Sequence, residues 1–282
     1  MSWQTYPLAF RLLSPLHVGY RKVGNLQQTR GYVTGKMLWA ALTERLTRDA
    51  LPGAAGADYA RIGAKVNDQF RFSYLYPALA PAGPVCHPWQ DEATFAYRFL
   101  DSYASTALDY DRQSAAEGLL HEVEFIRAHA RPLADEDPPQ VYLLGRLYIQ
   151  EELDAELAGW KMALSRLQVG GERGYGWGRL ELRSDLSAPQ ETGLPAPLVR
   201  LSKGEAITAH ARAVNAAGRP IVAGAHGPVE QLVGWERDNR AGRAADKPWR
   251  ISQALICYAP GSVITAETIF AIGPYGVWAA AQ

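Results

Sequence analysis

The sequence predicts an α+β fold in which helices cover one face of an antiparallel β-sheet. Two observations carry this prediction. Short segments rich in β-branched and aromatic residues alternate with two segments of helical periodicity, and turn-forming Pro and Gly residues separate them. The 282 residues, of which 48% are hydrophobic, are sufficient for a packed core in one large domain or two modest ones.

The first strand, helix and second strand are predicted in the N-terminal quarter of the chain. Residues 5–13 read as a strand that ends at Ser14–Pro15. Residues 36–51 have a helical period and stop at Pro52–Gly53. Residues 70–76 alternate between apolar and polar side chains, as a strand does. The helix places its apolar residues on one face: Met37, Leu38, Ala41, Leu42 and Leu46.

The middle of the chain interrupts this pattern. Residues 77–120 contain prolines, acids and aromatic residues without a period, which predicts a long insertion with a short helix near 95–103. Residues 121–128 and 141–150 then read as strands, and the polar loop 131–140 between them is expected to be a flexible hairpin tip.

A second helix and a last strand complete the pattern. Residues 152–167 are amphipathic, and residues 180–184 read as a strand. Strand, helix, strand, strand, helix, strand is the order of the ferredoxin-like βαββαβ fold, which also underlies the RNA-recognition motif but assigns no function by itself. The inner face of the second helix is expected to carry Leu153, Leu157, Trp160, Leu164 and Leu167.

The domain organisation follows from these elements. Residues 1–184 are expected to form the ferredoxin-like domain, with its insertion at 77–120. Residues 185–200 are proline-rich and read as a linker. Residues 201–282 contain short strand-like pieces between glycine turns, which predicts a C-terminal β-rich extension or a second, degenerate lobe of the same kind.

Charge and cysteine content restrict the classes of function. The 29 basic and 29 acidic residues cancel, which argues against a freestanding nucleic-acid binder, but the first 50 residues hold seven basic side chains against two acidic ones. Cys86 and Cys257 lie far apart, so we expect neither a disulfide framework nor a cysteine zinc site. The N-terminus lacks the features of a signal peptide, no apolar stretch is long enough for a membrane span, and a cytoplasmic protein is expected.

The loop at 169–179 is the strongest candidate for function. It interleaves five glycines with Arg173, Tyr175, Trp177 and Arg179. Glycine permits positive φ and close approach of N–H groups to a phosphate, arginine supplies charge, and aromatic rings can stack on bases. The alternative is an ordinary turn between a helix and a strand. The loop lacks the Walker and dinucleotide-binding patterns. Its glycines are Gly170, Gly171, Gly174, Gly176 and Gly178.

Four segments resemble the RAMP superfamily of CRISPR effector subunits. They are FRLLSPLHVGYRK at 10–22, GYVTGKMLWAAL at 31–42, TALDYDRQSAAEGLLHEVEFI at 106–126 and VGGERGYGWGRLEL at 169–182. They occur in the order that the family has. A fifth segment, YAPGSVITAE at 258–267, is similar to a C-terminal segment of the subunit that caps the crRNA 5′ end in type III-D complexes.

The resemblance implies a non-catalytic, crRNA-binding subunit of a type III-like effector that caps the crRNA 5′ handle. Its expected partners are crRNA, target RNA, the large signalling subunit and the backbone RAMP subunits, with no cofactor, metal or membrane. The implied RNA-binding residues are His17, Gly19, Tyr20, Arg21, Lys22, Arg30, Lys36, Arg112, Gly170, Gly171, Arg173, Gly174, Tyr175, Gly176, Trp177, Gly178 and Arg179.

Two catalytic alternatives remain open. A guide-processing endoribonuclease would use His17 as general base, and a backbone-type subunit would cut target RNA with an acid. The loop at 20–36, where that family places its aspartate, has neither Asp nor Glu, so such an acid would have to come from Asp109 or Asp111, which are also suited to shaping a hairpin turn. The sequence departs from the family pattern at two places: Thr34 stands in place of proline, and a glycine is missing in the 106–126 segment. The local geometry at both places is expected to differ from that of the family.

Overall fold

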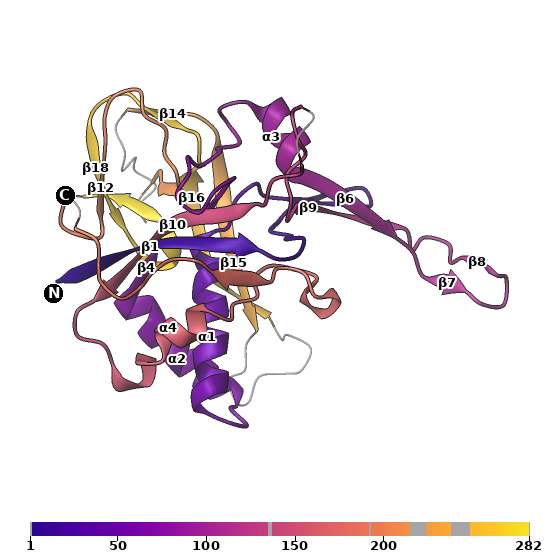
Figure 1. The fold of residues 1–282 in the computed structure, drawn as a ribbon, viewed down its shortest axis with the longest axis horizontal. Coiled ribbons are helices and arrows are strands. Elements are labelled where there is room, and N and C mark those ends of the chain that lie inside the picture. Colours follow the sequence, from indigo (N-terminus) through magenta and orange to yellow (C-terminus); the bar gives the residue numbers. More distant parts are fainter. Residues whose placement is uncertain (1, 135–136, 192, 215–223, 238–248, 282) are drawn as a thin grey trace.

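A computed structural model describes residues 2–134, 137–191, 193–214, 224–237 and 249–281 (Figure 1). The prediction of a mixed α/β fold is confirmed. The central sheet has the order β11–β1–β10–β4, with β5 also paired to β10, and every neighbouring pair is antiparallel. Its strands are β1 (Trp3–Leu12), β4 (Phe70–Phe72), β5 (Tyr76–Ala78), β10 (Tyr142–Gln150) and β11 (Leu180–Leu182).

Helices cover one face of the central sheet. They are α1 (Gly35–Ala50), α2 (Gly56–Gln69) and α4 (Trp160–Leu164), with a short 3₁₀ turn, η1 (Ala155–Leu157), before α4. Because side chains alternate along β1, Phe10 and Leu12 point to this face, where they are fully buried with Leu42 of α1 and Leu164 of α4. These contacts form the larger of the two hydrophobic clusters.

A second sheet covers the opposite face. This C-terminal sheet has the order β12–β18–β19–β13–β16–β15. Tyr74, Tyr76 and Tyr148 of the central sheet region pack with Phe270 and Trp278 in a second buried cluster. The aromatic face of the central sheet is therefore closed to solvent. The strands are β12 (Leu198–Leu201), β13 (Ala211–Arg212), β15 (Val229–Arg237), β16 (Trp249–Tyr258), β18 (Thr268–Ile272) and β19 (Trp278–Ala280).

A third sheet, the hairpin sheet, has the order β2–β3–β9–β6. Its outer part extends away from the body and ends in the β7–β8 ribbon, with α3 (Glu92–Phe99) at its base (Figure 1). The strands are β2 (Gly19–Val23), β3 (Leu26–Thr29), β6 (Leu100–Ser105), β7 (Leu108–Asp109), β8 (Ser114–Ala115) and β9 (His121–Ile126). The small elements β14 (Ala225–His226), β17 (Val263–Ile264), η2 (Arg173–Tyr175) and η3 (Pro274–Gly276) complete the fold.

The prediction that the second helix is one continuous element is wrong. Instead of one helix over 152–167, the chain forms η1, breaks at Gly159 and continues as α4. Gly159 has φ −75° and ψ near 6°, the N-cap position from which α4 starts. Of the predicted inner face, Leu157, Trp160, Leu164 and Leu167 are buried, and Leu153 is half-buried against the same core.

Three further differences concern the middle of the chain. Residues 56–69 form α2, which the sequence did not predict. The short helix of the insertion is Glu92–Phe99, so residues 100–103, predicted as helical, belong to β6. The strand predicted at 121–128 exists as β9, but it pairs with β3 and β6 outside the central sheet. Part of the predicted hairpin tip, 135–136, lies outside the described residues.

The C-terminal part is more regular than its short sequence pieces predicted. Residues 198–200, the end of the predicted linker, already belong to strand β12 of the C-terminal sheet, and Leu186, also in the predicted linker, is buried in the larger core. Within the described residues, no helix is long and apolar enough to cross a bilayer.

Candidate nucleic-acid interface

The glycine loop 169–179 packs directly on the turn that follows β1. The N–H of Gly171 donates to the carbonyl of His17 at 2.9 Å, and the N–H of Gly178 donates to the carbonyl of Pro15 at 2.7 Å. Two segments that are about 160 residues apart in the sequence thus form one surface. β2 leaves that turn at Gly19, and β11 leaves the loop after Arg179.

Two glycines of the loop are required by its geometry. Gly170 has φ +90°, and a Cβ there would collide with the carbonyl oxygen of His17. Gly178 has φ +74°, and a Cβ there would collide with the carbonyl oxygen of Val169. By contrast, a Cβ on Gly174 would meet no atom within 4 Å. The ends of the loop are therefore fixed by close backbone packing, while its tip is open.

The backbone donors of the loop are used differently from the sequence prediction. The N–H groups of Gly171 and Gly178 bond to the turn, and the N–H of Gly176 donates to the carbonyl of Arg173 at 3.0 Å. These three groups were expected to face a phosphate, but protein carbonyls occupy them because the loop must hold its own compact shape. Anion binding by this loop therefore cannot use these three backbone groups.

His17 lies beneath the loop. Its side chain is buried, with a residue exposure of 7%, and Nδ1 lies 2.7 Å from the carbonyl oxygen of Glu124 in β9. A Cβ on Gly171 would touch the imidazole at 2.9 Å. The ring therefore supports the loop from inside and does not present itself to a ligand.

The aromatic residues of the surface divide into exposed and packed rings. Tyr175 at the loop tip is 84% exposed. Tyr20 on β2 is 46% exposed and carries the guanidinium of Arg30 at 4.5 Å and that of Arg21 at 5.2 Å from its ring centroid. Trp177 packs edge-on against Phe125 at 5.0 Å. Tyr175 and Tyr20 are thus the rings that can stack on bases.

The exposed cations also differ in their partners. Within the described part of the chain, Lys22 and Arg179 are exposed and have no ion-pair partner. Arg21 donates to the side chain of Gln28 at 2.6 Å. Arg112, at the tip of the β7–β8 ribbon, lies 3.7 Å from Asp109. A polyanion could therefore bind Lys22 and Arg179 without first breaking an ion pair.

A first cavity, the hairpin cavity, lies between β2, the start of α1 and β15. Its volume is about 530 Å³, and its walls include Gly19, Tyr20, Arg30 and Lys36, four residues that the sequence predicted. The ammonium of Lys36 lies 5.3 Å from the ring centroid of Tyr275. The wall formed by 231–234 comes from the C-terminal sheet, and nothing in the sequence indicated it.

Arg30 is held from behind by a buried network. Its guanidinium donates to Glu230 at 2.9 Å and to the Tyr32 hydroxyl at 2.9 Å. His210 also bonds to Glu230 through Nε2, and its Nδ1 lies 2.6 Å from the Tyr74 hydroxyl. Because an ionised carboxylate only accepts, Nε2 carries the proton and Nδ1 accepts from Tyr74.

The charge state of the network follows from its contacts. Burial alone would raise the pKa of Glu230, but hydrogen bonds from His210 and Arg30 outweigh burial and lower this pKa to about 2. Burial lowers the pKa of His210, which keeps the ring neutral. The carboxylate of Glu230 therefore neutralises the charge of the buried guanidinium of Arg30. This ion pair stabilises the fold, and it leaves Arg30 only partly available to a ligand.

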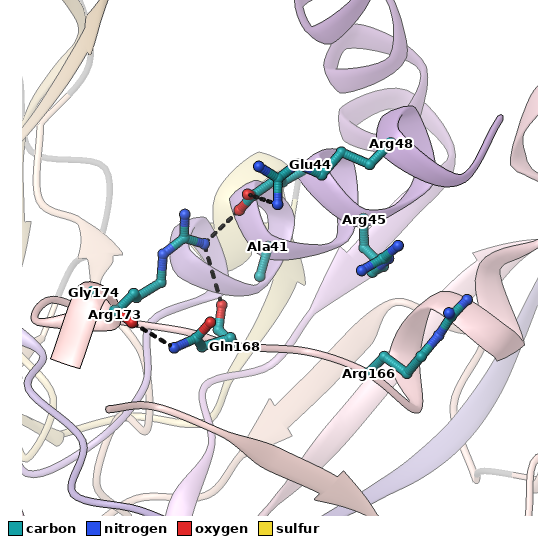
Figure 2. Close-up of a pocket in the computed structure, with 8 residues that line it drawn as sticks. All are labelled: Ala41, Glu44, Arg45, Arg48, Arg166, Gln168, Arg173 and Gly174. Atoms are coloured by element: carbon teal, nitrogen blue, oxygen red, sulfur yellow. Dashed lines mark hydrogen bonds and ion pairs between the residues drawn. The ribbon is translucent and has the colours of Figure 1, made fainter. Parts of the chain in front are cut away.

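A second cavity, the arginine cavity, lies between α1 and the segment that enters the glycine loop. Its volume is about 290 Å³. Figure 2 shows Arg173 reaching from the loop to Glu44 on α1, with Gln168 below it. The side-chain amide of Gln168 donates to the carbonyls of Arg173 at 3.0 Å and Trp177 at 2.8 Å, which fixes this end of the loop. The cavity is lined by Ala41, Glu44, Arg45, Arg48, Arg166, Gln168, Arg173 and Gly174.

The structure thus gathers most predicted residues around the turn at 15–19, with the exception of Arg112 on the distant ribbon. The sequence did not point to Glu230, His210, Arg45, Arg48 or Arg166. An excess of basic residues in the first 50 positions was a signal for Arg45 and Arg48, whereas no local pattern marked the other three. Within the described residues, no group of three or more His, Cys, Asp or Glu side chains could hold a metal ion.

Comparisons with known proteins find similarity in structures alone. No protein-family model matches the chain, and no curated protein matches it. Chains of the type III-B Cmr-beta complex are structural neighbours. One, from the complex bound to cognate target RNA, is 12% identical, with a TM-score of 0.41, and the match covers 64% of this chain and 96% of that chain.

Two further neighbours come from the same kind of complex. A chain of the apo state is 12% identical, with a TM-score of 0.38 and coverage of 65% of this chain and 98% of that one. A chain of the complex bound to cognate target RNA and AMPPnP is 10% identical, with a TM-score of 0.49 and coverage of 92% and 85%. Likeness at this level does not assign the chain to a family.

Proposed function

We propose that this chain is a non-catalytic RNA-binding subunit of a type III-like CRISPR ribonucleoprotein and that it holds the 5′ handle of the crRNA. One observation carries the proposal. The glycine loop and the turn at 15–19, which are two of the segments that resemble RAMP proteins, bond to each other through Gly171 and Gly178. The strand order β11–β1–β10–β4, with helices on one face, supports the ferredoxin-like arrangement that the resemblance implies.

The binding surface consists of exposed side chains around this junction. Lys22 and Arg179 supply exposed positive charge, and Tyr20 and Tyr175 supply rings for stacking. Arg173 extends the surface toward α1, and Lys36 lines the hairpin cavity beside it. Single-stranded RNA is bound by this combination of backbone charge and base stacking.

RNA is not expected on the face of the central sheet that lies opposite the helices. RNA-recognition motifs stack bases on aromatic residues of that face. Here Tyr74, Tyr76 and Tyr148 are buried against the C-terminal sheet. RNA is therefore expected at the edge of the sheet that carries the glycine loop. The exposed charges lie at this edge.

The non-catalytic part of the proposal rests on three observations. The ring of His17 is buried with Nδ1 engaged, which disfavours it as the base of a guide-processing endonuclease. Asp109 accepts the N–H groups of Asp111 and Arg112 at 3.1 and 3.2 Å, so its carboxylate shapes the turn of the ribbon. The acid-free stretch at 20–36 contains most of the β2–β3 hairpin and runs into the start of α1.

The test measures the affinity of the purified chain for a single-stranded RNA oligonucleotide as a function of salt. Lys22→Ala combined with Arg179→Ala is expected to weaken binding by about tenfold to a hundredfold at low salt. It is also expected to reduce the slope of log affinity against log salt by about 1.5. An unchanged slope would exclude this surface.

The matched control is Lys203→Ala combined with Arg212→Ala. It removes the same two residue types from exposed positions of the C-terminal lobe. We expect its affinity and salt slope to equal those of the parent chain. A similar loss in both double variants would mean that only net charge matters.

A further inference from the structure

The arginine cavity holds more positive charge than the protein needs to balance its own acids. Four arginines share two carboxylates there. Glu44 pairs with Arg48 at 3.3 Å and with Arg173, whereas Asp49 pairs with Arg45 and with Arg166, the latter at 3.0 Å. Four positive charges against two negative ones leave a formal charge of +2 in a cavity of about 290 Å³.

The carboxylates orient the guanidinium groups without using all their donors. Each guanidinium has five N–H donors, and the contacts with Glu44 and Asp49 use at most two per arginine. The arginine side chains remain between 30% and 62% exposed. Figure 2 shows them around the hollow, two from α1 and two from the opposite segment. Donors are thus preorganised and accessible on both sides.

Charge and size together select the ligand. A phosphate monoester carries a charge of about −1.5 to −2 at neutral pH, which matches the cavity, whereas an internal phosphodiester carries only one negative charge. Pockets for drug-sized molecules begin at roughly 300 Å³, so this cavity accommodates a phosphate or diphosphate group better than a whole nucleotide.

We propose that the arginine cavity is a binding site for a terminal phosphate group, adjacent to the surface that grips the RNA backbone and sharing Arg173 with it. Arg45 and Arg48 bind it from α1, and Arg166 and Arg173 bind it from the opposite segment, with the guanidinium forks matching phosphate oxygens. The phosphate belongs either to an RNA end or to a free phosphate compound. The RNA case rests on the proposed function, and the free-ligand case does not.

The experiment has two arms. In the first, calorimetry measures binding of inorganic phosphate and of pyrophosphate at constant ionic strength. In the second, fluorescence anisotropy compares one RNA oligonucleotide with a hydroxyl or a phosphate at its 5′ end, and likewise at its 3′ end. Arg166→Ala removes a donor from the cavity, and Arg200→Ala is the control, an arginine of similar exposure that lies 3.5 Å from Glu267 on the C-terminal sheet.

The site predicts a preference of about tenfold for the phosphorylated end, which corresponds to one added charge-assisted contact. Arg166→Ala abolishes the preference and leaves the affinity for hydroxyl-ended RNA unchanged, and Arg200→Ala alters neither. Pyrophosphate binding that Arg166→Ala removes supports the site even if the chain binds no RNA, in which case only the proposed function fails. RNA binding without any preference, together with no binding of inorganic phosphate or pyrophosphate, overturns the site and leaves the proposed function standing.

Discussion

Replacing Glu230 with alanine is expected to lower the free energy of unfolding by about 3–5 kcal/mol, because it leaves the guanidinium of Arg30 buried without a countercharge. The side chains of Glu230 and Arg30 are 19% and 13% exposed. Glu230 also accepts from the Nε2 of His210, whose side chain is fully buried. The change therefore strands two donors that water reaches poorly. Urea denaturation of the purified chain measures the loss.

Two variants make this result specific. Glu230→Gln keeps an acceptor for one donor but removes the charge, and its loss is expected to lie between those of the parent and of Glu230→Ala. Glu267→Ala removes a carboxylate that is 61% exposed and pairs with Arg200 at 3.5 Å, and a change within about 0.5 kcal/mol is expected there. Equal, small effects at Glu230 and Glu267 would show that the network contributes little.

Replacing Gly178 with alanine is expected to destabilise the fold by roughly 3 kcal/mol, because backbone strain and overpacking act together. The residue has φ +74°, and its new methyl group would collide with the carbonyl oxygen of Val169. The carbonyl of Val169 cannot move aside easily, because the N–H of the same residue donates to the carbonyl of Gly178 at 2.8 Å and holds this segment in place. Thermal and urea denaturation report the change.

The loop supplies its own control series. Gly176→Ala meets open space but has φ +84°, so it should cost about 1 kcal/mol from backbone strain alone. Gly174→Ala meets nothing within 4 Å and has no positive φ, so it should change stability by less than about 0.5 kcal/mol. A uniform effect along the series would contradict the geometry described for the loop.

Elements with a strong local pattern were predictable from the sequence. The helix expected at 36–51 is Gly35–Ala50, and the strands expected at 5–13 and 141–150 are Trp3–Leu12 and Tyr142–Gln150. In each case apolar residues recur at the period of the element and become its buried face. The local sequence determines the type and position of such elements, because consecutive residues carry their burial pattern.

Elements with a weak pattern were missed or joined wrongly. In α2 the buried residues are only Ile62, Gly63 and Val66, so few large apolar side chains mark its inner face. The apolar spacing at 152–167 fits one helix as well as two short ones, and the break at Gly159 is decided by packing. The sheet that β9 joins depends on distant partners, which a single sequence does not reveal.

The candidate site shows the same division between local and distant information. The glycine loop was predictable because its composition is local. The partner of Arg30 is Glu230, 200 residues away, and the arginine cavity joins α1 to a segment that begins more than 100 residues later. The sequence therefore identified residues of the surface without showing which of them are paired and which are exposed.

Photocrosslinking of bound RNA followed by mass spectrometry tests the central claim most directly, because it identifies the peptides that touch the ligand. We expect crosslinks at Tyr20 in β2 and at Tyr175 in the glycine loop, the exposed rings of the surface. Loss of RNA affinity in the Lys22 and Arg179 double variant should remove both crosslinks together. Crosslinks confined to the C-terminal sheet, with none at 19–23 or 170–179, would contradict the account.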